Sequence, residues 1–236
     1  MSSKTFFQWS VLVLALFMLA ACEAATTKPD VKTHKVPLGE ADFVAVDIRM
    51  GAGELILEAG ASDLLEGTFR YNVERWMPEV NYQVLNKHGK LSIRQRRRPG
   101  LHLGRAENAW NIRLNNHVPM DMAVKLGAGR SQLDLREFSI GRLDVDIGVG
   151  ELSLDLSGDR RDELTARIEG GVGHGTIYLP EHAGIRAEIR GGIGSIHAPG
   201  FHKDGHIYTN DGFEKTAPSI HLHIEAGIGS LELKLR

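Results

Sequence analysis

The stretch that decides the fold is LDVDIGVGELSLDL, residues 143–156. Apolar residues alternate with polar ones from Leu143 to Val149, and the alternation then continues on the opposite parity from Leu152 onward. Period-two alternation is typical of a half-buried β-strand. A one-residue shift would turn the second strand's apolar side to water unless the chain bends there. We therefore expect two strands that meet at a bend at Gly150-Glu151, with Val149 facing the core.

The same unit occurs six times along the chain, each time around a Gly-x-Gly sequence. The centres are Gly51-Ala52-Gly53, Gly127-Ala128-Gly129, Gly148-Val149-Gly150, Gly171-Val172-Gly173, Gly192-Ile193-Gly194 and Gly227-Ile228-Gly229. The four middle centres are 21–23 residues apart, a spacing that is typical of repeat architectures. The pattern predicts an all-β chain, a β-solenoid of stacked two-strand coils of about 21–23 residues each. A β-sandwich of hairpins is the alternative.

The N-terminal segment differs from the rest in composition. Residues 11–21 form an apolar run that is too short to span a bilayer comfortably and suits a signal peptide. The run ends in Leu19-Ala20-Ala21-Cys22, which resembles the bacterial lipobox, in which the cysteine is lipidated. We predict a lipoprotein signal peptide at residues 1–21, a lipid anchor on Cys22 that carries acyl chains such as palmitate, and a lipidated tether at residues 22–36. Glu23 favours the outer membrane, on its periplasmic side, if the source has one.

The remaining chain divides by regularity. Residues 37–108 hold one Gly-x-Gly unit and a less regular segment, in which we expect strands at 68–73, 80–85 and 91–95 and a hairpin turn at 87–90. This part is predicted to be an irregular β N-terminal cap or subdomain, because solenoid ends need atypical coils. The repeats are predicted to run from 109 to 236. The basic cluster around 94–105 has two interpretations, contact with an anionic envelope surface or a solvated loop.

The repeats are interrupted by an insertion at residues 199–218. Insertions in repeat proteins form loops on one face, which is often the binding face. We expect this loop to be dispensable for folding and to contact a partner; the alternative for its aromatic residues is that they fold back over the sheet. The candidate contact residues are Phe201, His202, His206, Tyr208 and Phe213.

Residues that could carry catalysis or bind a metal have simpler explanations. The strand alternation accounts for the candidate carboxylates as outward polar residues: Asp144, Asp146, Asp155, Glu169 and Glu188. Repeat alignment places His221 beside Arg186 and His223 beside Glu188, a mixed polar ladder rather than a set of metal ligands. The net charge of −2 does not suggest a nucleic-acid binder. We predict no enzymatic activity, no metal and no cofactor.

A family resemblance rests on residues 110–122, WNIRLNNHVPMDM, which run into Leu126-Gly127-Ala128-Gly129 and Leu133-Asp134-Leu135. This stretch resembles the signature of the bacterial toastrack family, related to LiaF-like (cell-wall-active antibiotics response) proteins and to adhesin-like β-solenoids. The resemblance implies an envelope β-solenoid without catalytic residues, and relatives implicated in sensing envelope stress through a histidine kinase.

The expected function is therefore that of a non-enzymatic cell-envelope lipoprotein. Its solenoid would be a binding or structural module, in envelope-stress sensing or adhesion, whose partners are the membrane and an envelope protein or glycan. The alternative is a glycan-binding or glycan-active solenoid. The chain has only three tryptophans, one of them in the predicted signal peptide. Few aromatic side chains are therefore available to stack on sugars.

Overall fold

In the computed structural model of the protein, residues 28–96, 106–192, 194–217 and 219–236 are described. The predicted signal peptide, Cys22 and residues 97–105 of the basic cluster lie outside them. The described residues form one sheet of 14 strands and one short 3-10 helix, η1 (Glu74–Trp76). The strands are β1 (Asp30–Val36), β2 (Phe43–Ala59), β3 (Leu65–Tyr71), β4 (Pro78–Leu85), β5 (His88–Gln95), β6 (Asn108–Leu114), β7 (Met120–Asp134), β8 (Ile140–Asp155), β9 (Leu164–Leu179), β10 (Gly184–Gly191), β11 (Gly194–His197), β12 (His202–Asp204), β13 (Ile207–Thr209) and β14 (Ser219–Leu235).

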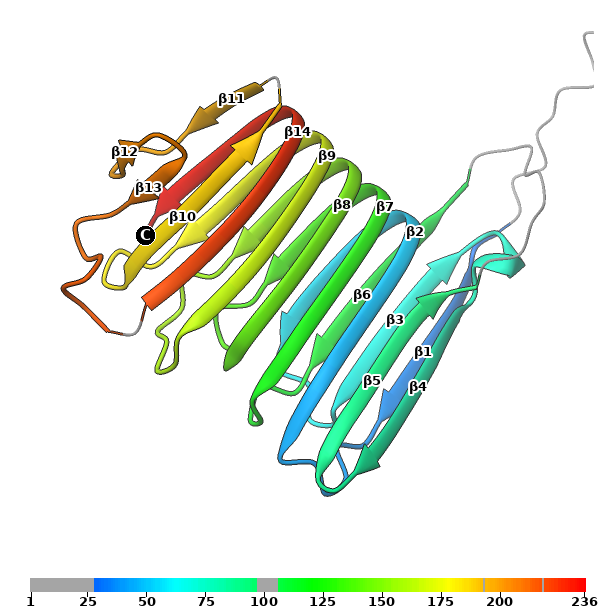
Figure 1. The fold of residues 1–236 in the computed structure, drawn as a ribbon. Helices are drawn as coiled ribbons and strands as arrows, with labels where there is room; N and C mark the ends of the chain where they lie inside the picture. Colours follow the sequence, from blue (N-terminus) through cyan, green and yellow to red (C-terminus); the bar gives the residue numbers. More distant parts are fainter. Residues whose placement is uncertain (1–27, 97–105, 193, 218) are drawn as a thin grey trace, which may run out of the picture.

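Five long strands bend once and contribute to two layers (Figure 1). The first halves of β2, β7, β8, β9 and β14 pair side by side in layer A, which β5 and β4 extend at one end and β10, β13 and β12 at the other. Their second halves form layer B, between β6, β3 and β1 at one end and β11 at the other. The predicted β-solenoid of stacked two-strand coils is thus confirmed as an open sheet folded over on itself.

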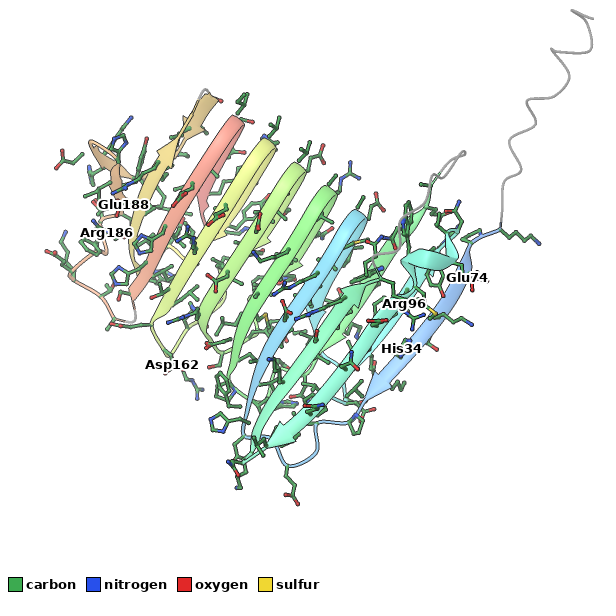
Figure 2. All side chains as sticks on the ribbon, turned by 45° about the vertical axis from the view of Figure 1, so that its right-hand side comes forward. His34, Glu74, Arg96, Asp162, Arg186 and Glu188 are labelled. Carbon is green, nitrogen blue, oxygen red and sulfur yellow. The ribbon has the colours of Figure 1, made fainter. Side chains whose placement is uncertain are left out.

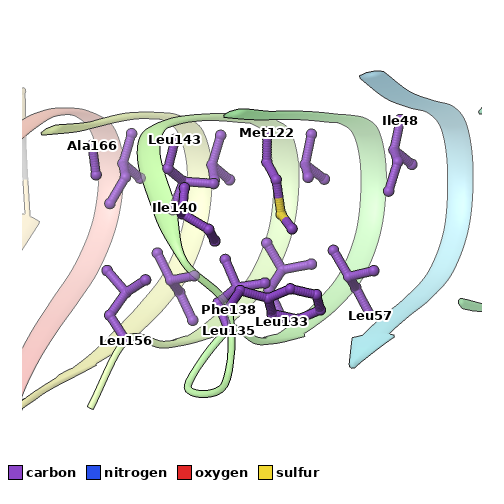
Figure 3. Packing of buried hydrophobic residues seen from close by; sticks show 14 of the residues in the cluster. Ile48, Leu57, Met122, Leu133, Leu135, Phe138, Ile140, Leu143, Leu156 and Ala166 are labelled. Carbon is purple, nitrogen blue, oxygen red and sulfur yellow. The ribbon is translucent and has the colours of Figure 1, made fainter. Parts of the chain in front are cut away.

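The core lies between the two layers. Figure 3 shows Ile48 and Met122 of layer A opposite Leu57 and Leu133 of layer B, and each of the four is at most 2% exposed. Most of the inward apolar residues of both halves join one continuous cluster. Burying a side chain of this size contributes roughly 1.5–3 kcal/mol, so this two-sided alternation is the main stabilising feature of the fold.

The bends are built from glycines that no other residue could replace. Gly150 has a φ of 142°, and a Cβ on it would lie 1.8 Å from the carbonyl oxygen of Gly129 in the next coil. Gly129 and Gly173 repeat this arrangement with φ values of 134° and 152°. Coils that stack in register bring their backbones together at the inside of the turn, and positive φ there requires glycine.

The middle residues of the Gly-x-Gly units point outward. Val149 is 53% exposed, Val172 is 48% exposed and Ile228 is 57% exposed. The expectation that Val149 faces the core is therefore wrong. The last inward residue before the bend is Ile147, and the next one is Leu152. The inward side therefore switches from odd-numbered to even-numbered residues within the Gly-x-Gly unit and not after it, because the tight inner side of the bend has no room for a side chain.

The N-terminal part differs from the prediction in three ways. Residues 30–36, assigned to the tether, form β1, an edge strand that pairs antiparallel with β3. Most residues of β1 are exposed. Its sequence therefore does not need the alternation of apolar and polar residues that marks the other strands. β2, assigned to the irregular cap, pairs with β7 from Val44 to Leu57 and is a full coil of the stack. The turn between β4 and β5 falls at Asn86-Lys87, both with positive φ, rather than at 87–90.

The strand order breaks at the C-terminal end. The order is β9, β14, β10, so the last strand of the chain inserts between two strands that precede it. β14 pairs in parallel with β9 on one side, over Ile220 to Leu235, and with β10 and β11 on the other. In the described part of the chain, no helix is long and apolar enough to cross a membrane.

Candidate functional site

The insertion at 199–218 forms a cap on the C-terminal end of layer A. β12 and β13 make an antiparallel hairpin, and β13 pairs with β10 through Arg186↔Thr209, Ala187↔Tyr208 and Glu188↔Ile207. The hairpin thereby covers the edge that β10 would otherwise expose, and an uncovered edge strand can pair with other chains. Residues 202–209 of the insertion are therefore part of the sheet rather than a separate surface loop, and Pro218 lies outside the described residues.

Two residues of the insertion are buried. Tyr208 is 6% exposed and joins the core cluster. Asn210 is 5% exposed, and its side chain accepts a hydrogen bond from the Ile185 amide at 2.9 Å and donates one to the Ala183 carbonyl at 2.8 Å. The expectation that the insertion is dispensable for folding does not fit these contacts, because its removal would leave backbone groups of the start of β10 without partners.

The other predicted contact residues lie nearer the surface. His202 is exposed, and its Nε2 lies 2.7 Å from Oδ1 of Asp211. The hydrogen bond from His202, and then its charge, hold the pKa of Asp211 below its ordinary value. His206 is exposed, whereas Phe201 and Phe213 are half-buried, with the Phe213 ring edge-on to His221 at 6.5 Å. The cap thus offers imidazole, carboxylate and aromatic edges for contact.

The predicted histidine ladder is confirmed by the strand register. Arg186 pairs with His221 and Glu188 pairs with His223. Figure 2 shows Arg186 and Glu188 at the C-terminal end of the stack. Nδ1 of His223 lies 3.8 Å from the Glu188 carboxylate, an ion pair when the ring is protonated. No group of three or more histidine, cysteine, aspartate or glutamate residues within the described ranges is arranged to hold a metal ion.

The predicted outward carboxylates lie on the outer faces of the two layers, half-buried between neighbouring side chains. Asp146 pairs with Lys125 of the preceding coil at 3.1 Å, and Glu169 pairs with Arg167 at 2.6 Å. Carboxylates also neighbour one another across the strands, Asp146 beside Glu169 and Asp155 beside Asp134, and Arg136 forms ion pairs with both members of the second pair.

A cavity of about 270 Å³ lies inside the bend at the C-terminal end, between β8, β9, β14 and the β10–β11 segment. Its walls include Ile147 and Leu152 from the middle of the stack and Ile189 from its end. This cavity was not predicted from the sequence. Its signal was present in the repeats, because Gly170 and Gly175 occupy inward positions that Ile147 and Leu152 fill in the preceding coil.

The two ends of the stack are far apart. β1 and β12 stand at opposite ends of the strand order, ten neighbours apart, which corresponds to about 50 Å at the usual strand spacing. In Figure 2, His34 and Glu74 lie at one end and Arg186 and Glu188 at the other. The chain therefore enters the fold at the end opposite to the cap.

Comparisons with known proteins agree with this architecture. A family described as the N-terminal domain of toast_rack, DUF2154, matches residues 25–178. The structure of a candidate cell adhesion protein from Clostridium sporogenes ATCC 15579 is similar over 89% of this chain and 100% of its own, with 32% identity and a TM-score of 0.80. A candidate adhesin from Bacteroides fragilis NCTC 9343 aligns over 88% of this chain and 98% of its own, at 10% identity and a TM-score of 0.30, which is too weak a superposition to support an argument. No curated protein is significantly similar to this chain.

Proposed function

The chain belongs to the toast_rack family, and on that premise we propose that it is a non-enzymatic, adhesion-like binding module of the bacterial cell envelope. The proposal includes no catalytic residue. The described candidate carboxylates Asp146 and Glu169 form ion pairs with Lys125 and Arg167. The proposal also includes no cofactor. The shape of the stack supports a binding role. One end of the stack lies near the N-terminus, and the other end carries the cap with its exposed polar and aromatic side chains.

The observation that carries the proposal is the separation of about 50 Å between β1 and β12. In the proposal, Cys22 carries the lipid anchor, on the periplasmic side of the outer membrane if the source has one. Asp30, the first residue of β1, lies only eight residues beyond Cys22, and a fully extended segment of that length spans at most about 28 Å. A tether of this length holds the β1 end near the membrane and leaves the cap at a distance from it.

The proposed partner is an envelope protein or glycan that binds the exposed part of the cap. Its contact residues are His202, His206 and the accessible edges of Phe201 and Phe213. Tyr208 belongs to the core instead, although one side of it reaches the cavity. A role in envelope-stress sensing would use the same presentation, with the partner acting as the signal.

Site-specific photo-crosslinking in intact cells tests the proposal. A crosslinking residue at His202 samples the cap, and one at Lys32 on β1, equally exposed, samples the anchored end as the matched control. We expect a discrete crosslinked species from position 202 that position 32 does not give. Equal crosslinking from both positions, or from position 32 alone, would contradict presentation by the cap.

A further inference from the structure

The cavity at the C-terminal bend exists because glycine or alanine occupies some of the inward positions in two rows of neighbouring residues, one in each layer. We call these rows ladders. In layer A the ladder beside the bend runs Met50, Leu126, Ile147, Gly170, Ala226 and Gly191 across the stack. In layer B, Leu152 and Leu231 stand on either side of Gly175. Large side chains thus fill this corner in the middle coils, whereas toward the end only Ala226 and Leu231 carry side chains in the two ladders.

The fold does not require glycine at these two positions. A Cβ on Gly170 would meet nothing within 4 Å, and one on Gly175 would lie 3.4 Å from Cδ1 of Leu231, a tolerable contact. The bend glycines differ, since a Cβ on Gly150 or Gly173 would lie 1.8 Å from a carbonyl oxygen. Backbone geometry therefore explains the bend glycines but leaves the empty space around Gly170 unexplained.

The walls of the cavity suit an apolar group. They are formed by the inward side chains of Ile147, Leu152, Ile168, Ile177, Ile189 and Ile224. An apolar cavity of roughly 150 Å³ in another protein stays dry and takes up benzene, and this one is larger, at about 270 Å³. It reaches across four neighbouring strands, β8, β9, β14 and β10, or about 14 Å at the usual spacing, so its length suits a chain rather than a compact ring.

The end of the cavity beneath the cap is polar. Tyr208 lines it at 6% exposure, opposite Ala187 in the sheet. Lys203 and His206 line the same end, with Nζ of Lys203 5.4 Å from the centre of the Tyr208 ring. An ammonium group and a tyrosine at the same end of the cavity favour an anionic headgroup.

From these observations we infer that the cavity binds a single-chain anionic amphiphile of the fatty-acid class. Its hydrocarbon chain lies along the bend between Ile147 and Ile189, and its carboxylate lies at the cap beside Tyr208 and Lys203. This site is separate from the exposed cap surface, so the inference goes beyond the proposed function and does not depend on it.

Calorimetric titration of the purified full chain with decanoate tests the inference, with decanol as the ligand that shares the chain but lacks the charge. We expect saturable decanoate binding and weaker decanol binding. Gly170→Val should fill the corner and weaken decanoate binding at least about tenfold, whereas Gly141→Val, on the exposed side of β8, should leave it unchanged. Tyr208→Phe, which keeps the ring, should weaken decanoate binding about tenfold while leaving decanol binding unchanged.

Circular dichroism of each variant confirms its fold, and Gly170→Ala serves in place of Gly170→Val if the larger residue is not tolerated. Absence of decanoate binding would overturn the inference, as would equal binding by the wild type and the filled variant. Decanol binding as tight as that of decanoate would overturn the assignment of the anionic headgroup.

Discussion

The middle coils and the C-terminal end of this protein solve the same packing problem differently. In β7, β8 and β9 the chain order equals the spatial order, and each bend is closed by glycines in backbone contact. At the end, β14 inserts between β9 and β10, and the ladder beside the bend falls from Ile147 to Gly170. The middle is a repeat that packs by register alone, whereas the end needs a returning strand and a hairpin cap to cover its edge.

Glycine therefore has two structural roles in the same repeat. Gly150 is required by its φ of 142° and by the carbonyl oxygen of Gly129. Gly170 is required by neither, and its effect is to leave space in the core. A Gly-rich repeat alone does not distinguish a glycine that closes a turn from one that opens a cavity.

The largest effect should come from placing a charge in the middle core. Leu154 is fully buried, so Leu154→Asp should destabilise the fold by about 4 kcal/mol or more, because an unpaired carboxylate would be removed from water. Val149→Asp, on the exposed side of the same strand, should change stability by less than about 1 kcal/mol. Urea denaturation compares the two, and equal losses would contradict the outward orientation of Val149.

The two kinds of glycine should respond in opposite directions to alanine. Gly150→Ala should lower the free energy of unfolding by about 3 kcal/mol, because its backbone conformation and its space both exclude a side chain. Gly170→Ala should raise it by about 0.5–1 kcal/mol, since alanine restricts the unfolded chain and adds contacts in the cavity. Thermal denaturation of both variants checks this, and destabilisation by Gly170→Ala would mean that the space is needed by the fold.

A smaller effect is expected at the cap. Asn210→Ala removes the acceptor for the Ile185 amide and the donor for the Ala183 carbonyl and should cost about 2 kcal/mol. His202→Ala, which breaks only the exposed pair with Asp211, should be nearly neutral by comparison. Equal effects on the melting temperature would show that the cap does not stabilise the end of layer A.

The sequence predicts the middle of the molecule well because period-two alternation and Gly-x-Gly spacing act locally. The coils, the bends and the pairs Arg186↔His221 and Glu188↔His223 follow from repeat alignment and are confirmed. The predicted inward orientation of Val149 was wrong, because alternation alone does not show at which residue of a bend the inward side switches.

The features that sequence reasoning missed depend on contacts between distant segments. The insertion of β14 beside β10, the stacking of β2 on β7 across 60 intervening residues and the edge strand β1 have no local pattern. Tyr208 was a candidate contact residue with packing over the sheet as the alternative, and it pairs opposite Ala187 and packs into the core. Aromatic residues in an insertion indicate burial or contact equally, and only the pairing of β13 with β10 distinguishes the two.

Disulfide trapping of the strand order tests the central claim most directly. Three pairs of cysteines are introduced into a Cys22→Ser background, at residues 167 and 223, at 223 and 188, and at 167 and 188. The register places Arg167 beside His223 and His223 beside Glu188, so the first two pairs are neighbours on one face. The third pair is separated by two strand spacings, about 10 Å, which exceeds the Cα separation of roughly 4.4–6.8 Å that a disulfide allows. The account predicts rapid intramolecular disulfides in the first two pairs and none in the third. A disulfide between 167 and 188, without those to 223, would show that β10 follows β9 directly and would contradict it.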